Sequence, residues 1–269
     1  MSTIRLAIAG VAGRMGQALV RAALAQDGFT ITGAAERAGA AATGQDIGAL
    51  VGLAPLGVTV AADVATAARD ADVWIDFSTP AATRAAMAAL PAAGVRAAVI
   101  GTTGMDAAGE AAIAEAARTI AIVQSGNFSL GVNVLAALVR QAAQRLGADW
   151  DIEIVESHHR RKVDAPSGTA LMLGEAAAAG RGRALRDLRL PPREGVTGAR
   201  PEGGIGFAVV RAGGIVGEHE VILASETETL RLAHHAADRA IFATGALHAA
   251  RWAADRGPGL YAMADVLGL

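Results

Sequence analysis

Hydrophobic residues in the first half of the chain fall into short apolar runs separated by stretches with helical spacing. The apolar runs predict strands over residues 4–9, 30–35, 58–60, 72–76, 97–100 and 120–123. The stretches between them predict helices over about 16–24, 63–69, 80–92 and 106–118, with a loop over 38–57 that contains one helical turn near 46–50. Strands that alternate with helices form a parallel sheet covered on both faces, so this half predicts an α/β domain with a doubly wound, Rossmann-like sheet.

The pattern of the second half changes from regular alternation to a cluster of strands. It predicts a long helix over 127–146, a strand over 152–155, a helix over 167–179, and strands over 204–211, 215–223 and 228–235. We expect the last three strands to be antiparallel, with the first two joined across Ala212-Gly213-Gly214. Residues 180–203 predict an exposed, irregular segment that leaves the domain core. This half therefore predicts a second, α+β domain with a mostly antiparallel sheet.

A final helix over about 238–253 and the tail to Leu269 are expected to return to the first domain. The predicted boundaries place one domain at residues 1–127, completed by about 238–269, and the other at 128–237.

Composition narrows the classes of function. The net charge of −2 in 269 residues offers no basic surface for nucleic acid or for membranes. The hydrophobic fraction of 52% comes mostly from alanine, and charged residues interrupt every apolar stretch before it could span a bilayer. The first residues lead directly into a strand without the pattern of a signal peptide, so we expect a cytoplasmic protein. The chain has no cysteine, which excludes disulfides, thiolate metal sites and cysteine nucleophiles.

A glycine-rich turn connects the first strand to the first helix. It consists of Gly10, Val11, Ala12, Gly13, Arg14, Met15 and Gly16. Strand, glycine turn and helix are the context of a dinucleotide-phosphate site, because free amides at the helix start attract the pyrophosphate. Ala12 stands where the usual fingerprint has glycine, and the alternative is a βα turn that binds nothing.

The second strand ends at Glu36-Arg37, about where an acid that binds the adenosine ribose is expected. A glutamate there would accept hydrogen bonds from both ribose hydroxyls, which favours NADH. An arginine beside it could stack on adenine or pair with a 2′-phosphate, which favours NADPH. The alternative is an exposed ion pair at a strand end.

Three further strand ends carry small, hydroxyl-bearing or amide side chains that could surround the rest of a dinucleotide. They are 76–80, Gly101-Thr102-Thr103-Gly104 and Ser125-Gly126-Asn127-Phe128. The alternative is helix capping, which Ser, Thr, Asn and Asp often provide. We favour capping for Ser78, Thr79 and Asp106.

The stretch from Glu156 to Leu171 contains Lys162, the only lysine among 24 basic residues. A lysine can release a proton near neutral pH and an arginine cannot, so Lys162 predicts a proton-transferring group. His158 and His159 lie close by, and Pro166 precedes Ser167-Gly168-Thr169, which predicts a helix start able to bind carboxylate or phosphate. The alternative is a basic strand end followed by a capped helix.

We expect no metal site in this stretch, because adjacent histidines on an extended segment point to opposite sides. The four other histidines, at 219, 234, 235 and 248, are expected to be structural, with His234 and His235 the most apt to approach the pocket.

The sequence of residues 156–170 resembles the signature of the bacterial 4-hydroxy-tetrahydrodipicolinate reductase (dihydrodipicolinate reductase) family. The resemblance covers nearly the whole chain, including residues 10–16, 100–104, 127–133, 206–212 and 215–219. The chain differs from some relatives at Ser78-Thr79 and at Ser125-Gly126, and both places bear on nucleotide preference.

The resemblance implies an oxidoreductase of diaminopimelate and lysine biosynthesis that uses NADH or NADPH. It implies that His158 and Lys162 handle the proton, and that His159, Ser167, Gly168 and Thr169 bind a small cyclic dicarboxylate. It also implies that the cofactor is lined by the glycine turn from Gly10 to Met15, by Glu36 and Arg37, and by residues 101–103 and 125–128. The resemblance further implies a cytoplasmic homotetramer, with a second domain that binds substrate and mediates assembly. Two alternatives remain at this point: another two-domain dehydrogenase of the homoserine dehydrogenase type, and a nucleotide-sensing regulator without turnover.

Overall fold

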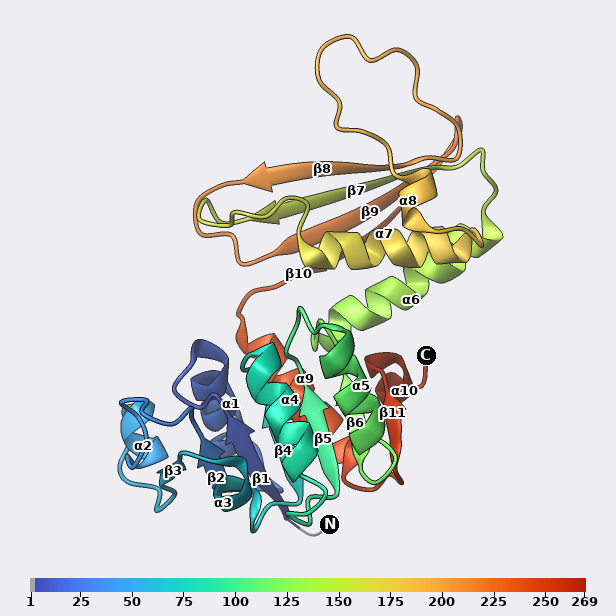
Figure 1. Cartoon of the computed structure of the whole chain (residues 1–269). Helices are drawn as coiled ribbons and strands as arrows, with labels where there is room; N and C mark the ends of the chain where they lie inside the picture. The colour runs from blue at the N-terminus through green and yellow to red at the C-terminus, as the bar shows by residue number, and fades with distance from the viewer. Residues whose placement is uncertain (1–2) are drawn as a thin grey trace. The chain divides into compact units, whose positions relative to one another are not determined.

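The computed structural model describes residues 3–269, which form two compact units. The first unit comprises residues up to Ser129 together with Ala240–Gly268, and the second comprises Leu130–Arg239. Figure 1 shows both, coloured along the chain.

The first unit is built on a seven-stranded sheet in the order β11-β6-β5-β4-β1-β2-β3, and its strand pairs are parallel. The strands are β1 Ile4–Ala9, β2 Phe29–Ala35, β3 Val60–Ala61, β4 Val73–Asp76, β5 Ala97–Ile100, β6 Ala121–Gln124 and β11 Gly259–Tyr261. The helices are α1 Arg14–Leu24, α2 Ile47–Leu50, α3 Val64–Ala68, α4 Pro80–Ala89, α5 Ala107–Ala116, α9 Ala240–Ala253 and α10 Met263–Leu267. The predicted doubly wound α/β domain is therefore confirmed, and the short strand β11 is an addition that the sequence pattern did not predict.

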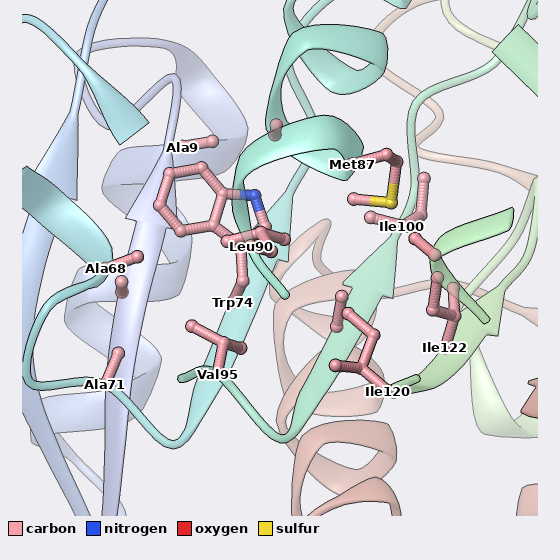
Figure 2. Packing of buried hydrophobic residues seen from close by; sticks show 14 of the residues in the cluster. Ala9, Ala68, Ala71, Trp74, Met87, Leu90, Val95, Ile100, Ile120 and Ile122 are labelled. Carbon is pink, nitrogen blue, oxygen red and sulfur yellow. The ribbon is translucent and has the colours of Figure 1, made fainter. Parts of the chain in front are cut away.

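Residue size along the strands explains how helices cover this sheet. One face buries Trp74 of β4 against Met87 and Leu90 from α4 and the turn that follows it, as Figure 2 shows. The neighbouring strands place small residues on that face, among them Ala9 of β1, so that the indole fits. Side chains alternate between faces along a strand, so Ile75 is buried on the opposite face, where α9 packs.

The second unit is a four-stranded sheet in the order β10-β9-β7-β8. Its strands are β7 Asp151–His158, β8 Ile205–Arg211, β9 Glu218–Ala224 and β10 Thr229–His235, and its helices are α6 Leu130–Arg145, α7 Gly168–Gly180 and α8 Leu185–Leu188. Ile152 and Ile154 of β7 are fully buried and pack with Leu173 of α7 and Val139 of α6. The predicted α+β domain with a mostly antiparallel sheet is confirmed.

The expected hairpin across Ala212-Gly213-Gly214 is wrong. β7 lies between the two strands, parallel to β8 and antiparallel to β9. The connection is six residues long, 212–217, because β9 begins at Glu218 rather than near residue 215. Six residues can step across the end of one strand, a distance of roughly 10 Å. The segment 212–217 therefore crosses the carboxyl end of β7, where the backbone amide of Ala212 donates to the carbonyl of His158 over 2.9 Å.

Replacing Gly245 of α9 with alanine is expected to destabilise the first unit. A Cβ at this position would lie 1.7 Å from the backbone oxygen of Phe128. Relieving an overlap of this kind costs about 1–3 kcal/mol or more, which exceeds the gain of about 1 kcal/mol from placing alanine in a helix. We expect a lower midpoint of urea unfolding. Gly257→Ala, which meets no atom within 4 Å, is the control and should stay within about 0.5 kcal/mol of the wild type. Equal midpoints for both variants would contradict the close approach at Gly245.

Candidate functional site

The glycine turn after β1 is closed by its own backbone. Gly10 has a φ of 62°, in the left-handed region, and its carbonyl accepts a hydrogen bond of 3.0 Å from the amide of Gly13. A Cβ on Gly16 would lie 2.3 Å from the Gly10 oxygen, so α1 can begin this close to the turn only with glycine there.

The turn and the helix start fit a dinucleotide. α1 begins at Arg14, and its N-cap, Gly13, has no side chain that could cap the helix, so backbone amides of the first turn can meet a pyrophosphate. The carboxylate of Glu36 accepts a hydrogen bond of 3.0 Å from the amide of Ala12, which brings the acid at the end of β2 against the glycine turn. A carboxylate has about four acceptor positions, so Glu36 can also accept from ribose hydroxyls. Arg37 beside it is exposed.

The sheet order brings the predicted strand ends to one edge, because β1, β4, β5 and β6 are successive neighbours. The ideal Cβ position of Gly10 lies 3.3 Å from Cβ of Ser78, so the loop after β4 touches the glycine turn. Ligands of parallel sheets bind at such carboxyl edges.

The expected caps are partly correct. Thr79 caps α4 and Asp106 caps α5, each by accepting a hydrogen bond from a backbone amide in the first turn. The expectation for Ser78 is wrong, because its hydroxyl donates to the carboxylate of Asp76 over 2.5 Å.

Two of the predicted cofactor residues point their side chains into the protein. The Thr102 hydroxyl is 3.3 Å from Asp76 and 2.9 Å from the Thr83 hydroxyl, so only its backbone is free to line a site. Phe128 is 1% exposed and packs edge-to-face on Phe77 with ring centroids 5.2 Å apart.

The remaining predicted residues at this edge are more open. Thr103 and Gly126 are exposed, and Gly101 lies under the ring of Phe77. The Ser125 hydroxyl donates to the carbonyl of Asn127 over 2.8 Å, which shapes the loop after β6.

Sequence reasoning gave no role to Asp76, which is fully buried and holds the loops after β4 and β5 together through Ser78 and Thr102. An acidic residue at the end of an otherwise apolar strand was the signal that could have indicated it.

The centre of the second unit is a fully buried carboxylate, Glu156. It lies at the carboxyl end of β7 and accepts hydrogen bonds from His158 Nδ1 at 2.6 Å, from both terminal nitrogens of Arg211 at 2.7 Å, and from the amide of Ser167 at 2.9 Å. Burial alone would raise the pKa of Glu156, but hydrogen bonds from Arg211, His158 and Ser167 outweigh it and leave the pKa below its ordinary value.

Lys162 is held rather than free. Its ammonium lies 2.8 and 2.9 Å from the two carboxylate oxygens of Asp164, and its side chain is 20% exposed. The hydrogen bond from Lys162 lowers the pKa of Asp164, so this carboxylate is ionised near neutral pH.

His159 points away from His158 and binds another arginine. Its Nε2 lies 2.9 Å from a terminal nitrogen of Arg239. Because a guanidinium can only donate, Nε2 accepts and the ring proton is on Nδ1. Burial, followed by the charges of Arg239 and Arg161, lowers the pKa of His159 and keeps the ring neutral.

The predicted helix start is present. Ser167 is the N-cap of α7, a helix of 13 residues, and its hydroxyl accepts from the amide of Ala170 over 3.1 Å. Gly168 at the first helical position is exposed, and a Cβ there would meet nothing within 4 Å. Thr169 follows in the same turn. The dipole and amides of such a start favour an anion.

His234 and His235 are expected to be the histidines most apt to approach the pocket, and both line a pocket that they share with His219, but His219 is the one that contacts Ser167 and His158. His219, directly opposite Glu156 in the β7–β9 pairing, lies 3.0 Å from the Ser167 hydroxyl through Nε2. Its ring packs edge-to-face on that of His158 with centroids 5.1 Å apart. His235 instead pairs with Glu218 at an exposed position.

The second unit thus links His158, the loop of Lys162 and the start of α7 through the contacts of Glu156 and Arg211. Arg211 and His219 were given no part by sequence reasoning, because nothing in the spacing of the chain links them to residues near 158.

Two kinds of feature are absent from residues 3–269. No group of three or more His, Cys, Asp or Glu side chains there is arranged to hold a metal ion. No helix there is long and apolar enough to cross a membrane.

Comparison with family models matches the two halves of the chain to two parts of one family. Residues 4–128 match the description "Dihydrodipicolinate reductase, N-terminus" and residues 131–267 match "Dihydrodipicolinate reductase, C-terminus".

Curated relatives are similar over the full length. A 4-hydroxy-tetrahydrodipicolinate reductase of Parvibaculum lavamentivorans is 55% identical over 267 residues, which cover 99% of this chain and 98% of the relative. One of Rhodopseudomonas palustris is 53% identical over 269 residues, covering 100% of this chain and 99% of the relative.

Two solved structures share the fold. A dipicolinate-bound dihydrodipicolinate reductase from Paenisporosarcina sp. TG-14 has a TM-score of 0.74 and 24% identity, with 97% of each chain covered. An amine dehydrogenase from Mycobacterium smegmatis has a TM-score of 0.65 and 18% identity, covering 96% of this chain and 94% of its own.

His219 is expected to make stability depend on pH. Burial, with the charge of His158 next, lowers the pKa of His219 from 6.5 to about 4. Between these values the unfolded chain binds the proton and the folded chain does not, so stability falls as pH drops from about 6.5 to about 4. The loss over that range is about 3 kcal/mol.

Urea unfolding of the wild type and His219→Gln at pH 7 and pH 4.5 measures this effect. The advantage of the wild type at pH 7 should shrink by most of that amount at pH 4.5, since glutamine does not titrate. A difference between the two proteins that is the same at both pH values would show that His219 is not buried in its neutral form.

Proposed function

The chain belongs to the dihydrodipicolinate reductase family, and from this premise we propose that it reduces 4-hydroxy-tetrahydrodipicolinate to tetrahydrodipicolinate with NADH or NADPH, in diaminopimelate and lysine biosynthesis. The observation that carries this proposal is the gathering of His158, Lys162 and the start of α7 in one unit of a chain whose other unit has a glycine turn suited to a dinucleotide. The match of both halves to this family argues against a dehydrogenase of the homoserine dehydrogenase type.

The reaction needs one hydride and one proton. Loss of water from the 4-hydroxy compound gives a conjugated cyclic imine, and a hydride and a proton then saturate one of its double bonds. When bound, NADH or NADPH supplies the hydride. The residues of the chain bind and orient the dicarboxylate and supply the proton.

The division of roles follows from charge and position. The amides at Gly168 and Thr169 and the ring of His159 hold the carboxylates of the substrate. The predicted contact from Ser167 is not part of this proposal, because its amide and hydroxyl are already bonded and it acts as the cap of the helix. Lys162 or His158 gives the proton. Asp164 holds the terminal nitrogen of Lys162 in place, and His158 keeps its Nδ1 on Glu156, so that the other nitrogen of the His158 ring is the one that can exchange a proton.

The second unit also has a surface suited to assembly. The sheet face opposite α6 and α7 carries partly exposed apolar side chains, including Val155, Ile222 and Val210, the last 43% exposed. A face of this kind supports self-association, and we infer a homotetramer in the cytoplasm.

The direct test is the loss of NAD(P)H absorbance when the product of the preceding synthase is added to the protein. Oxidation of one equivalent of nucleotide per equivalent of substrate supports the proposal. Binding of the nucleotide without its oxidation would instead identify a nucleotide-sensing regulator.

Lys162→Arg is expected to lower kcat by about 100-fold or more, the usual contribution of a general acid. Arginine retains the positive charge but does not release a proton near neutral pH. The nucleotide Kd, measured by fluorescence titration, should change less than about twofold, which controls for misfolding. Turnover close to that of the wild type would exclude Lys162 from proton transfer.

Arg37→Ala is expected to raise KM for NADPH by about tenfold, the value of one lost charge-assisted contact of about 1.4 kcal/mol. KM for NADH should change little, because NADH lacks the 2′-phosphate that the exposed guanidinium can bind. Glu36→Gln is the matched variant and should weaken NADH more than NADPH, since the carboxylate accepts from both ribose hydroxyls. Unchanged KM values for both nucleotides in Arg37→Ala would place Arg37 outside the site, and equal increases for both would indicate stacking on adenine rather than contact with a 2′-phosphate.

A further inference from the structure

Glu156 connects three segments of the second unit that are far apart in the sequence. Its two carboxylate oxygens take four hydrogen bonds from β7, β8 and the start of α7. The residue is fully buried, so each acceptor position that it uses is protected from water. A buried ion pair is a weak source of stability, because an apolar pair of similar volume often does as well, so its role is more specific than holding the fold together.

The contact with His158 determines which ring nitrogen can exchange a proton. A carboxylate can only accept, so Nδ1 of His158 carries a hydrogen in both the neutral and the charged ring. Nε2 is therefore the nitrogen at which a proton arrives or leaves. The segment 212–217 lies against it, because the ideal Cβ position of Gly217 is 3.2 Å from Nε2, and a side chain there would press on this atom.

Through its contact with Arg211, Glu156 also fixes the position of Lys162. The guanidinium that binds Glu156 with both terminal nitrogens also donates to the backbone carbonyl of Asp164 over 2.8 Å. Asp164 in turn holds the Lys162 ammonium with both carboxylate oxygens. Arg211 thus fixes the loop that presents the lysine, and Glu156 fixes Arg211.

The third contact of Glu156, with the amide of Ser167, fixes the start of α7. Oε1 of Glu156 accepts the amide hydrogen of Ser167, the N-cap of α7, while the Ser167 hydroxyl accepts from Ala170 and contacts His219. The amide and the hydroxyl of the cap are thereby both engaged, which fixes the place where α7 begins.

We propose that Glu156 is a positioning residue of the active site: one buried carboxylate sets the tautomer of His158 and, through Arg211 and Ser167, aligns Lys162 and the anion-binding start of α7 before substrate arrives. This inference deepens the proposed function and rests on it. It assigns Glu156 no contact with substrate or cofactor.

Glu156→Gln tests the proposal, because it keeps the size of the side chain and removes one acceptor. The amide oxygen is expected to take the place of Oε1, which receives Ser167 and one terminal nitrogen of Arg211. The amide nitrogen then faces His158 Nδ1 and the other terminal nitrogen of Arg211, and of these two only the imidazole can accept a hydrogen bond from it. The ring must then carry its hydrogen on Nε2.

Nitrogen-15 NMR of the histidine rings reports this change in the resting protein without any substrate. We expect His158 to have its hydrogen on Nδ1 in the wild type and on Nε2 in Glu156→Gln. We also expect kcat to fall about 100-fold with an unchanged nucleotide Kd.

Glu153→Gln is the matched control. Glu153 lies on the same strand, points to the opposite face and binds Arg193 and Arg200, so it has the same chemistry away from the site. Its kcat and its His158 spectrum should equal those of the wild type.

Glu156→Asp provides a second variant if the glutamine variant does not fold. Aspartate retains the charge for Arg211 but is shorter by one methylene and cannot keep all the contacts of Glu156, so His158 should show both tautomers and kcat should fall at least tenfold.

An unchanged tautomer in both variants would overturn the proposal, and so would a changed tautomer with normal kcat. If the wild type itself does not turn over substrate, the proposed function fails, and with it the catalytic purpose of Glu156. The tautomer comparison would then still show whether Glu156 sets the ring of His158.

Discussion

The second unit depends on the compensation of one buried negative charge. A carboxylate removed from water is costly unless charge and hydrogen bonds replace its hydration. Glu156 obtains both from Arg211, His158 and the amide of Ser167, which fill its acceptor positions from three directions. Because the carboxylate of Glu156 must be hydrogen-bonded when it is buried, it also fixes the positions of its three donors.

The strand order of the second sheet makes this compensation possible. Because β7 lies between β8 and β9, its last residues have a neighbour on each side: Arg211 is paired with His158 across one edge, and His219 with Glu156 across the other. A hairpin of β8 with β9 would have left β7 at an edge and one of these partners out of reach. The same strand order requires segment 212–217 to cross the end of β7. The strand order therefore determines both the path of the chain and the partners of Glu156.

The parts that sequence could predict are those encoded by neighbours in the chain. Strand–turn–helix alternation, the glycines at 10, 13 and 16, and the cap at Ser167 are local, and the structure contains each of them. Lys162 was identifiable because it is unique among 24 basic residues.

Pairing across long separations was not predictable: Glu156 and Arg211 are 55 residues apart. Side-chain direction was also hidden, since Thr102 and Phe128 look like binding residues in the sequence but are turned inward. The spacing of Glu156 and His158, two residues apart on one strand, was the overlooked local signal, because such residues share a face.

The two units differ in the part of the chain that each offers at its candidate site. The first unit presents backbone: the amides of the glycine turn and of the start of α1 carry no side-chain identity. Ala12 can therefore stand where the usual fingerprint has glycine, because its contribution to the turn is the amide that Glu36 accepts. The second unit instead presents side chains, and in the proposed reaction their protonation matters. There even a substitution by a similar residue changes the chemistry. Arginine in place of Lys162 would keep the charge that faces Asp164, but it would not release a proton near neutral pH.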